Sequence, residues 1–316
     1  MDKMKLNNNE IGFSCRAKGG VKVKNKMKIA VTAILCTMVF LSGCNAKPTS
    51  DGDADLAKGE TAEYIASAKE TLESASSFAS DFYAEVQMNE EKEKTISKAK
   101  VEMIREPLTV GITTQDLFGN TTTDSQIYLE KTNDGVNMYM SYNGQWTEMT
   151  LEEENAMNSV GMYDAAKDMD LLLASGENWE QVSAKGGIVT ITGEIPAQKV
   201  YDVSEAGFFL QIAGMNGVGE SYYSDVEAVP FEIQLKEDGT PISFSVDFAK
   251  TLETVMNHVL QELGQEDTEP IKVEKYMITQ TISKLGETKN IDIPAGARNA
   301  INYEKEISLI ESNSEK

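Results

Sequence analysis

The sequence predicts an α+β protein built on an antiparallel sheet, with helices packed against one face of that sheet. Three observations support this fold class. Alternating apolar and polar residues recur over about 78–150 and 178–290, turn signals rich in Asn, Asp and Gly separate several of these segments, and other segments repeat apolar residues at helical spacing. Alternation gives a strand one apolar face, and helical spacing gives a helix an apolar stripe. Helices are therefore expected to cover the apolar face of the sheet.

The first 43 residues are typical of a bacterial lipoprotein signal. Residues 1–28 are basic, and the apolar run Ile29–Phe40 follows them. Such a run is shorter than the about 20 residues of a membrane-spanning helix, and its place behind a basic stretch is typical of a secretory signal. Leu41-Ser42-Gly43-Cys44 resembles the lipobox, which implies removal of residues 1–43 and a diacylglyceryl anchor on Cys44. The alternative is an ordinary buried cysteine in an N-terminal helix.

The charge and cysteine content exclude several classes of function. The 316 residues carry a formal net charge of −22, and because residues 1–43 hold eight basic and two acidic side chains, the remaining 273 residues carry −28. This acidity argues against a nucleic-acid partner, since phosphate contacts need Lys and Arg. Cys15 and Cys36 precede Cys44, and the chain has one His. We therefore expect no disulfide, no metal site and no cofactor.

In the first half of the chain after Cys44, the sequence predicts a tether, a helix and an antiparallel meander. Residues 44–60 are rich in Asp, Gly, Lys and Pro without an apolar period, which predicts a flexible acidic tether. Apolar residues at helical spacing predict a helix over Ala62–Phe78. Strands are then expected at 82–88, 99–103, 108–112, 127–129, 136–140 and 145–149. Asn133-Asp134-Gly135 and Asn143-Gly144 supply hairpin turns, because Asn, Asp and Gly tolerate a positive φ.

The second half alternates between helices and strands. Helices are predicted at Gly161–Ala174, at Ala206–Ala213 and at Leu252–Leu260, which has a clear apolar stripe. Strands are predicted at 189–195, 231–235, 242–248 and 276–282. Residues 61–305 are expected to form a single domain, and the polar residues 306–316 to form a tail.

No residue pattern selects a catalytic group. His258 lies beside the apolar stripe of its helix, and the chain has no nucleophile motif that it could serve as a base. Carboxylates are so abundant that chance pairs are expected, so a hydrolase that uses two of them stays as an alternative. The protein is not expected to be an enzyme.

Methionine and aromatic residues gather in one hairpin and in the helical middle. Methionine fills irregular space and suits surfaces that accept varied apolar partners. The residues that could line an apolar ligand cavity are Met138, Met140, Trp146, Met162, Met169, Phe209 and Phe244. The alternative is a core that is simply rich in methionine.

The order of lipobox, tether, helix and meander resembles bacterial lipoproteins of the LolA/LppX-like group. The meander contains Ile127-Tyr128-Leu129, Met138-Tyr139-Met140 and Gly144-Gln145-Trp146, and the ending Ile291-Asp292-Ile293-Pro294-Ala295 is also similar. The resemblance covers roughly residues 60–303. It implies a strongly curved sheet, an open half-barrel, with helices packed on its concave face and an apolar cavity that holds lipids or lipoproteins. Classical members are soluble carriers, so a shuttle role is not implied for a lipid-anchored chain.

Three functions follow. The first is a monomeric binding protein, anchored by lipid to the extracytoplasmic face of the cell membrane, that holds a lipid-like or other apolar ligand. The second is a cell-surface interaction or sensing lipoprotein with a packed core and no small-molecule ligand. The third is the carboxylate hydrolase. The space between sheet and helices is the feature that separates the first two.

Overall fold

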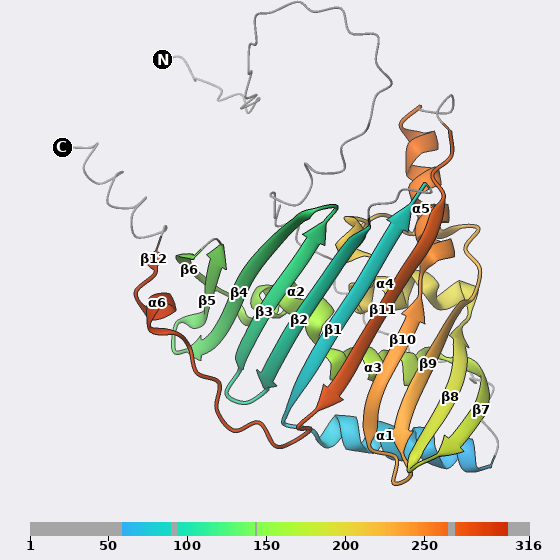
Figure 1. Cartoon of the computed structure of the whole chain (residues 1–316), viewed down its shortest axis with the longest axis horizontal. Helices are drawn as coiled ribbons and strands as arrows, with labels where there is room; N and C mark the ends of the chain where they lie inside the picture. Colours follow the sequence, from blue (N-terminus) through green and yellow to red (C-terminus); the bar gives the residue numbers. More distant parts are fainter. Residues whose placement is uncertain (1–58, 90–93, 143, 265–268, 303–316) are drawn as a thin grey trace, which may run out of the picture. The chain divides into compact units, whose positions relative to one another are not determined.

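Strands from both halves of the chain form one open sheet. The computed structural model describes residues 59–89, 94–142, 144–264 and 269–302. Within these residues the strand order is β12-β6-β5-β4-β3-β2-β1-β11-β10-β9-β8-β7 (Figure 1). All neighbours pair antiparallel except β12 and β6, which pair in parallel. The predicted antiparallel meander is confirmed.

The sheet consists of two meanders that meet at its centre. The first contains β1 (Ser77–Met88), β2 (Thr95–Ile104), β3 (Thr109–Phe118), β4 (Thr121–Thr132), β5 (Gly135–Tyr142) and β6 (Gln145–Leu151). The second contains β7 (Glu177–Lys185), β8 (Ile188–Ile195), β9 (Val229–Lys236), β10 (Pro241–Asp247) and β11 (Val273–Ser283), and β12 (Ile301–Asn302) adds to the edge at β6. β1 and β11 pair from Ala79 and Ser283 to Met88 and Val273, which joins the two halves.

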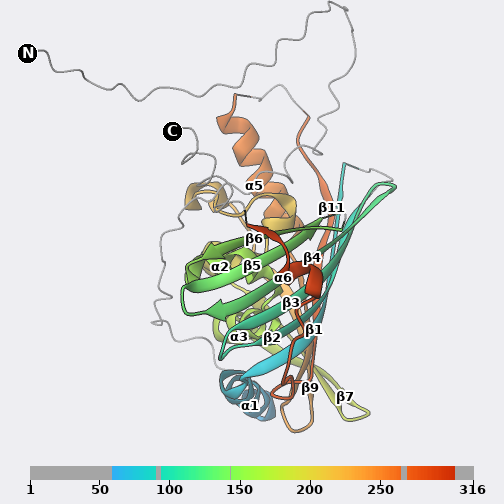
Figure 2. The same ribbon diagram turned by 90° about the vertical axis from the view of Figure 1, so that its left-hand side faces the viewer.

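The helices lie mainly on the concave face of the curved sheet (Figures 1 and 2). They are α1 (Glu60–Ser74), α2 (Glu153–Val160), α3 (Ala165–Ser175), α4 (Val200–Ala206) and α5 (Ala249–Glu262), with the short α6 (Ala295–Arg298) near the end of the described chain. α2 packs on β5, α3 packs on β1 and β11, and α5 packs on β11, while α1 and α4 contact α3. This is the α+β half-barrel that the sequence resemblance implied.

Alternation along the strands creates the core. On β1, Phe78, Phe82 and Val86 are buried against the helices, while Asp81 between them is exposed on the other face. Each strand contributes its apolar set to one side because successive side chains point to opposite faces. Apolar burial of this kind is the main favourable term in folding.

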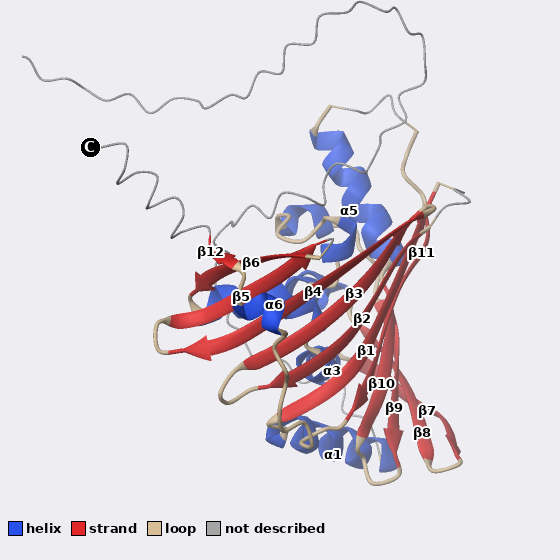
Figure 3. Cartoon of the chain, turned by 60° about the vertical axis from the view of Figure 1, so that its left-hand side comes forward, coloured by secondary structure: helices blue, strands red, loops and turns tan. Residues whose placement is uncertain are grey.

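A segment after β11 crosses the outer, convex face of the sheet (Figure 3). We call residues 284–300 the strap. At one end, Gly286 N donates to Ser77 O at 2.7 Å. At the other end, the Arg298 guanidinium donates to both carboxylate oxygens of Glu130 at 2.9 and 3.0 Å. The strap is therefore held to the outer face at both ends.

Two predicted helices have wrong boundaries. The helix predicted over Ala62–Phe78 ends at Ser74, because β1 begins at Ser77. The helix predicted over Gly161–Ala174 is preceded by α2 and begins only at Ala165. Asp164 interrupts the helical path there and caps α3 with its side chain.

The helix predicted over Ala206–Ala213 is wrong. The observed helix, α4, precedes this segment and ends at Ala206. Phe208 has a φ of 55°, which a right-handed helix excludes, and only the 3-10 turn Gln211–Ala213 follows. The edge strand β7 was missed, since its outward residues break the alternation: Val182 is 59% exposed.

Candidate functional site

Six of the seven residues predicted to line an apolar cavity belong to the interface between sheet and helices. They are Met138 and Met140 on β5, Met162 in the turn before α3, Met169 on α3, Phe209 after α4 and Phe244 on β10. Trp146 is the exception. Its ring packs against Tyr128, with centroids 5.9 Å apart, and against Gly296 of α6 on the outer face. The prediction for Trp146 is therefore wrong.

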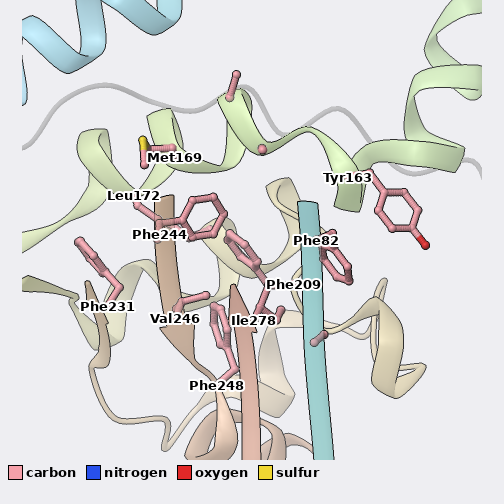
Figure 4. Packing of buried hydrophobic residues seen from close by; sticks show 14 of the residues in the cluster. Phe82, Tyr163, Met169, Leu172, Phe209, Phe231, Phe244, Val246, Phe248 and Ile278 are labelled. Atoms are coloured by element: carbon pink, nitrogen blue, oxygen red, sulfur yellow. The ribbon is translucent and has the colours of Figure 1, made fainter. Parts of the chain in front are cut away.

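Side chains fill the space between the sheet and the helices (Figure 4). The Phe209 ring stacks on Phe248 with a centroid distance of 5.1 Å, and Tyr163 meets Phe82 edge-on at 5.2 Å. The cavity lined by Phe82, Met162, Phe208, Phe209, Ile212 and Ile278 has about 0 Å³ of room for a water molecule. This cavity is closed to an acyl chain in the described conformation.

The elements that cover the concave face form a helix layer. We use this name for α2, α3, α4, the turn Gly161–Tyr163 and the connector of residues 207–228 between α4 and β9. The connector contains only the 3-10 turns Gln211–Ala213 and Glu220–Tyr223. Loops of this length inside a compact domain are commonly functional.

A polar cluster interrupts the apolar interface at α3. Arg105 donates to both carboxylate oxygens of Asp164 at 3.0 and 3.2 Å, and Asp164 Oδ1 also accepts the N-H of Lys167 at 3.1 Å. One turn later, Asp168 Oδ2 accepts a hydrogen bond of 2.7 Å from Gln280 Nε2 on β11. Asp164, Asp168 and Gln280 are all buried. The cluster therefore joins the helix layer to the sheet by charged and polar contacts.

The environment of Asp168 disfavours its ionised form. Burial raises the pKa of Asp168 well above its ordinary value, and the negative charge of Asp164 raises it further. The positive charge of Lys167 and the hydrogen bond from Gln280 oppose this shift. Burial dominates because the carboxyl has no access to water.

Two buried polar atoms of this cluster have no hydrogen-bond partner among the described protein atoms. They are Asp168 Oδ1 on α3 and Gln280 Oε1 on β11. Leaving a buried polar atom unpaired costs about 1–3 kcal/mol. The helix layer is therefore bound to the sheet less tightly than its apolar burial alone would suggest.

The connector begins with a strained residue. Phe208 has a φ of 55°, a conformation that costs free energy for a bulky side chain. Its ring lies against Gly161, and Lys167 Nζ lies 5.2 Å from the ring centroid. Any side chain at position 161 would collide with this ring. The Phe208 ring thus packs the start of the connector against the turn before α3.

The remaining chemical candidate, His258, has a structural role. Its Nδ1 lies 2.7 Å from Tyr222 O, and its Nε2 lies 3.7 Å from Asp225 Oδ2. These contacts tie the connector to α5. Within the described ranges, no three His, Cys, Asp or Glu side chains are grouped so that they could hold a metal ion.

The predicted lipid anchor lies outside the described residues. Cys44, the signal over residues 1–43 and the tail over 306–316 all belong to the undescribed parts, and so does most of the tether over 44–60. These assignments stay predictions. No helix among the described residues is long and apolar enough to cross a membrane.

Comparison with known proteins gives a match to a family of unknown function and similarity to several solved structures. The model of the family of unknown function DUF6612 matches residues 60–172. The structure is similar to the Mycobacterium tuberculosis lipoprotein LppX, with 14% identity, 73% of this chain and 97% of that chain covered, and a TM-score of 0.39. It is also similar to LprF from Mycobacterium bovis, with 11% identity, 75% and 97% coverage, and a TM-score of 0.44. No curated protein sequence matches the chain significantly.

The predicted resemblance is found again in these matches, since LppX is one of them. The identities and TM-scores are too low to carry a ligand or a residue role from either protein to this chain.

The polar cluster at α3 was missed at the sequence level, although it left a signal. Gln280 stands in the apolar set of β11 between Ile278 and Ile282. Asp168 lies in the buried stripe of α3 beside Met169. A polar residue at an apolar position of a regular pattern predicts a buried partner, but it does not identify that partner.

Proposed function

We propose that this chain is a lipid-anchored extracytoplasmic binding protein, without catalytic activity, that holds a lipid-like or other apolar ligand between the sheet and the helix layer. The observation that carries the proposal is the character of that interface. It is apolar on both sides, yet polar atoms without partners reduce its stability. Separation of the layer from the sheet would offer an apolar ligand a matching surface.

The described conformation is the closed one. An apolar ligand must replace the contacts that Met162, Phe208 and Phe209 make across the interface, because their cavity holds no free space. Replacing one apolar contact by another costs little, whereas exposing the interface to water costs about 25 cal/mol for each Å². The ligand would therefore enter as the layer moves and would stabilise the open form.

The direct test uses cis-parinaric acid, a fatty acid whose fluorescence rises in apolar surroundings. The Phe208→Gly variant removes the ring at the start of the connector and suits the positive φ there. We expect it to take up the probe several-fold faster than the wild type. Asn178→Gly is the matched control, because Asn178 has a φ of 54° but lies exposed on β7. No rise in emission with either the wild type or Phe208→Gly would contradict the proposal.

The anchor is tested separately from the ligand. In a bacterial host, radiolabelled palmitate should be incorporated into the wild type and not into Cys44→Ala. The wild type should fractionate with membranes, and the variant should not. Incorporation that persists in Cys44→Ala would contradict lipidation at this cysteine without affecting the ligand test.

The closed cavity also favours a second candidate, a cell-surface interaction or sensing lipoprotein with a packed core. The packed aromatic rings beneath the helix layer and the lack of room in the cavity around Met162 are the observations that favour it. Under this function, the emission of parinaric acid does not rise with the wild type or with either variant, and the helix layer stays on the sheet. The same experiment therefore separates the two functions.

A further inference from the structure

The outer face of the sheet carries a groove that the apolar site does not use. It lies beside the strap, holds about 530 Å³, and is lined by β1, β2, β3, β4, the end of β11 and the strap itself. The helix layer covers the opposite face (Figure 3). A volume of this size falls within the range of small-molecule sites, about 300–1,000 Å³.

A glycine in the middle of β3 explains how the strap comes so close. A Cβ at Gly111 would lie 2.9 Å from Ile291 Cγ2 and 3.2 Å from Tyr128 Cε1. Glycine inside a strand often marks the close approach of another segment. The missing side chain at Gly111 therefore lets the strap lie close to β3 and β4. The half-buried Tyr128 ring on β4 then forms one wall of the groove.

The charges in the groove nearly cancel. Lys100 pairs with Asp81 at 3.0 Å, and Lys284 pairs with Glu102 at 3.2 Å. Asp292 on the strap adds one further carboxylate. Exposed ion pairs of this kind contribute about 0–1 kcal/mol, so their carboxylates can accept hydrogen bonds from a ligand at little cost. A nearly neutral lining favours an uncharged ligand over a polyanion or a polycation.

The floor of the groove argues against a peptide. Lys100, Glu102 and Gly111 lie within the paired stretches of central strands, whose main-chain groups are used in the sheet. A peptide backbone would find no free strand edge to extend. Recognition must come from side chains: carboxylates, hydroxyls and the amide of Asn290. This is a set that accepts and donates hydrogen bonds to hydroxyl groups.

The groove is long enough for several linked units. It crosses β11, β1, β2, β3 and β4, and four strand spacings amount to about 19 Å. Tyr128 offers an apolar ring, and while burial is the main cause that raises the pKa of Tyr128, the negative charge of nearby Glu102 raises it further. An aromatic ring beside a carboxylate can contact the apolar face and the hydroxyl edge of one sugar ring at once.

We infer that the groove beside the strap is a binding site for a short neutral oligosaccharide. The carboxylates of Asp81, Glu102 and Asp292 accept hydrogen bonds from sugar hydroxyls, and the Tyr128 ring packs on a sugar face. The site lies on the face opposite the helix layer, so it is independent of the apolar ligand. It would let a membrane-anchored chain contact glycan on its extracytoplasmic side.

The test is saturation-transfer NMR with the purified full-length protein and three separate probes at about 10 mM, a concentration that detects weak binding. The probes are N,N′,N″-triacetylchitotriose, cellotriose and a tetra-alanine peptide with blocked ends. We expect signal transfer to at least one trisaccharide and none to the peptide. The double variant Asp81→Asn, Glu102→Gln should weaken sugar binding about tenfold or more, because it removes two charge-assisted acceptors.

A matched control keeps the test specific. The double variant Asp134→Asn, Glu180→Gln also removes one aspartate and one glutamate charge, but from exposed positions outside the groove. It should leave sugar binding unchanged. Circular dichroism establishes that both double variants are folded. The proposal is overturned if neither sugar receives signal, if the peptide binds instead, or if both double variants weaken binding equally.

Discussion

The buried carboxyl of Asp168 makes the stability of this protein depend on pH in a defined way. The side chain is inaccessible to water, and burial raises its pKa well above the ordinary 3.8. Its Oδ1 has no partner among the described atoms, and neither has Gln280 Oε1 beside it. Asp168→Asn keeps the shape of the side chain and the hydrogen bond from Gln280 Nε2. Its NH2 group supplies a donor for Gln280 Oε1, and the side chain cannot ionise.

The magnitude follows from one proton. At a pH well below 3.8 the carboxyl is protonated in both the folded and the unfolded chain, so the unfolding free energy does not depend on its ionisation there. As the pH rises towards the raised pKa, the unfolded chain releases this proton while the folded chain retains it. The wild type therefore loses about 1.4 kcal/mol of unfolding free energy for each pH unit in this window, relative to Asp168→Asn. Above the folded-state pKa the difference is constant.

Urea unfolding followed by circular dichroism, measured at half-unit steps from pH 4 to pH 8, gives the required free energies. Asp168→Asn should be the more stable protein at pH 8, and the two curves should converge towards pH 4. Asp202→Asn, an exposed carboxylate on α4, should follow the wild type throughout. Parallel curves for the wild type and Asp168→Asn, or a variant that is less stable at pH 8, would refute the reasoning.

Three further predictions concern other parts of the fold. Glu85 has a pKa of about 2 because Lys94, Tyr83 and Lys275 donate hydrogen bonds to it. Its contribution to the unfolding free energy is therefore complete above pH 4.5 and is lost as the pH falls towards 2. Glu85→Gln should flatten the dependence of the urea-unfolding free energy on pH in this range. Gly111→Val should displace the strap and cost about 1–3 kcal/mol by overcrowding, measured by urea unfolding with limited proteolysis of the strap. Phe248→Ala, at a fully buried ring, should cost about 3–5 kcal/mol in the same assay, and a loss below 1 kcal/mol would contradict the assigned core.

The sheet could be predicted well because its signals are local. Alternation places one face of each strand against the core, and Asn-Gly or Asp-Gly turns mark the hairpins. The central pairing of β1 with β11 joins residues almost 200 positions apart, and no local pattern announces it. The strap likewise runs over the outer face without periodicity, so Trp146 was assigned to the wrong side.

The helix layer was harder to predict because tertiary contacts override its local patterns. Asp164 follows the 3-10 turn Gly161–Tyr163 and caps the next helix, and its partly exposed partner Arg105 comes from a turn that is distant in the sequence. Phe208 adopts a positive φ that its sequence does not signal. The predicted cavity residues were mostly placed at the correct interface, but whether their side chains leave a void depends on packing detail that a sequence pattern does not hold.

The most direct test of the proposed apolar site is to count the lipid that the protein carries. The full-length protein is purified from bacterial membranes in mild detergent and extracted with chloroform and methanol, which leaves a covalent anchor on the chain. Mass spectrometry of the extract should find a defined lipid species at close to one molecule for each protein molecule, above the level in extracts of an unrelated lipoprotein. An extract that matches that of the unrelated lipoprotein would contradict a ligand between the sheet and the helix layer.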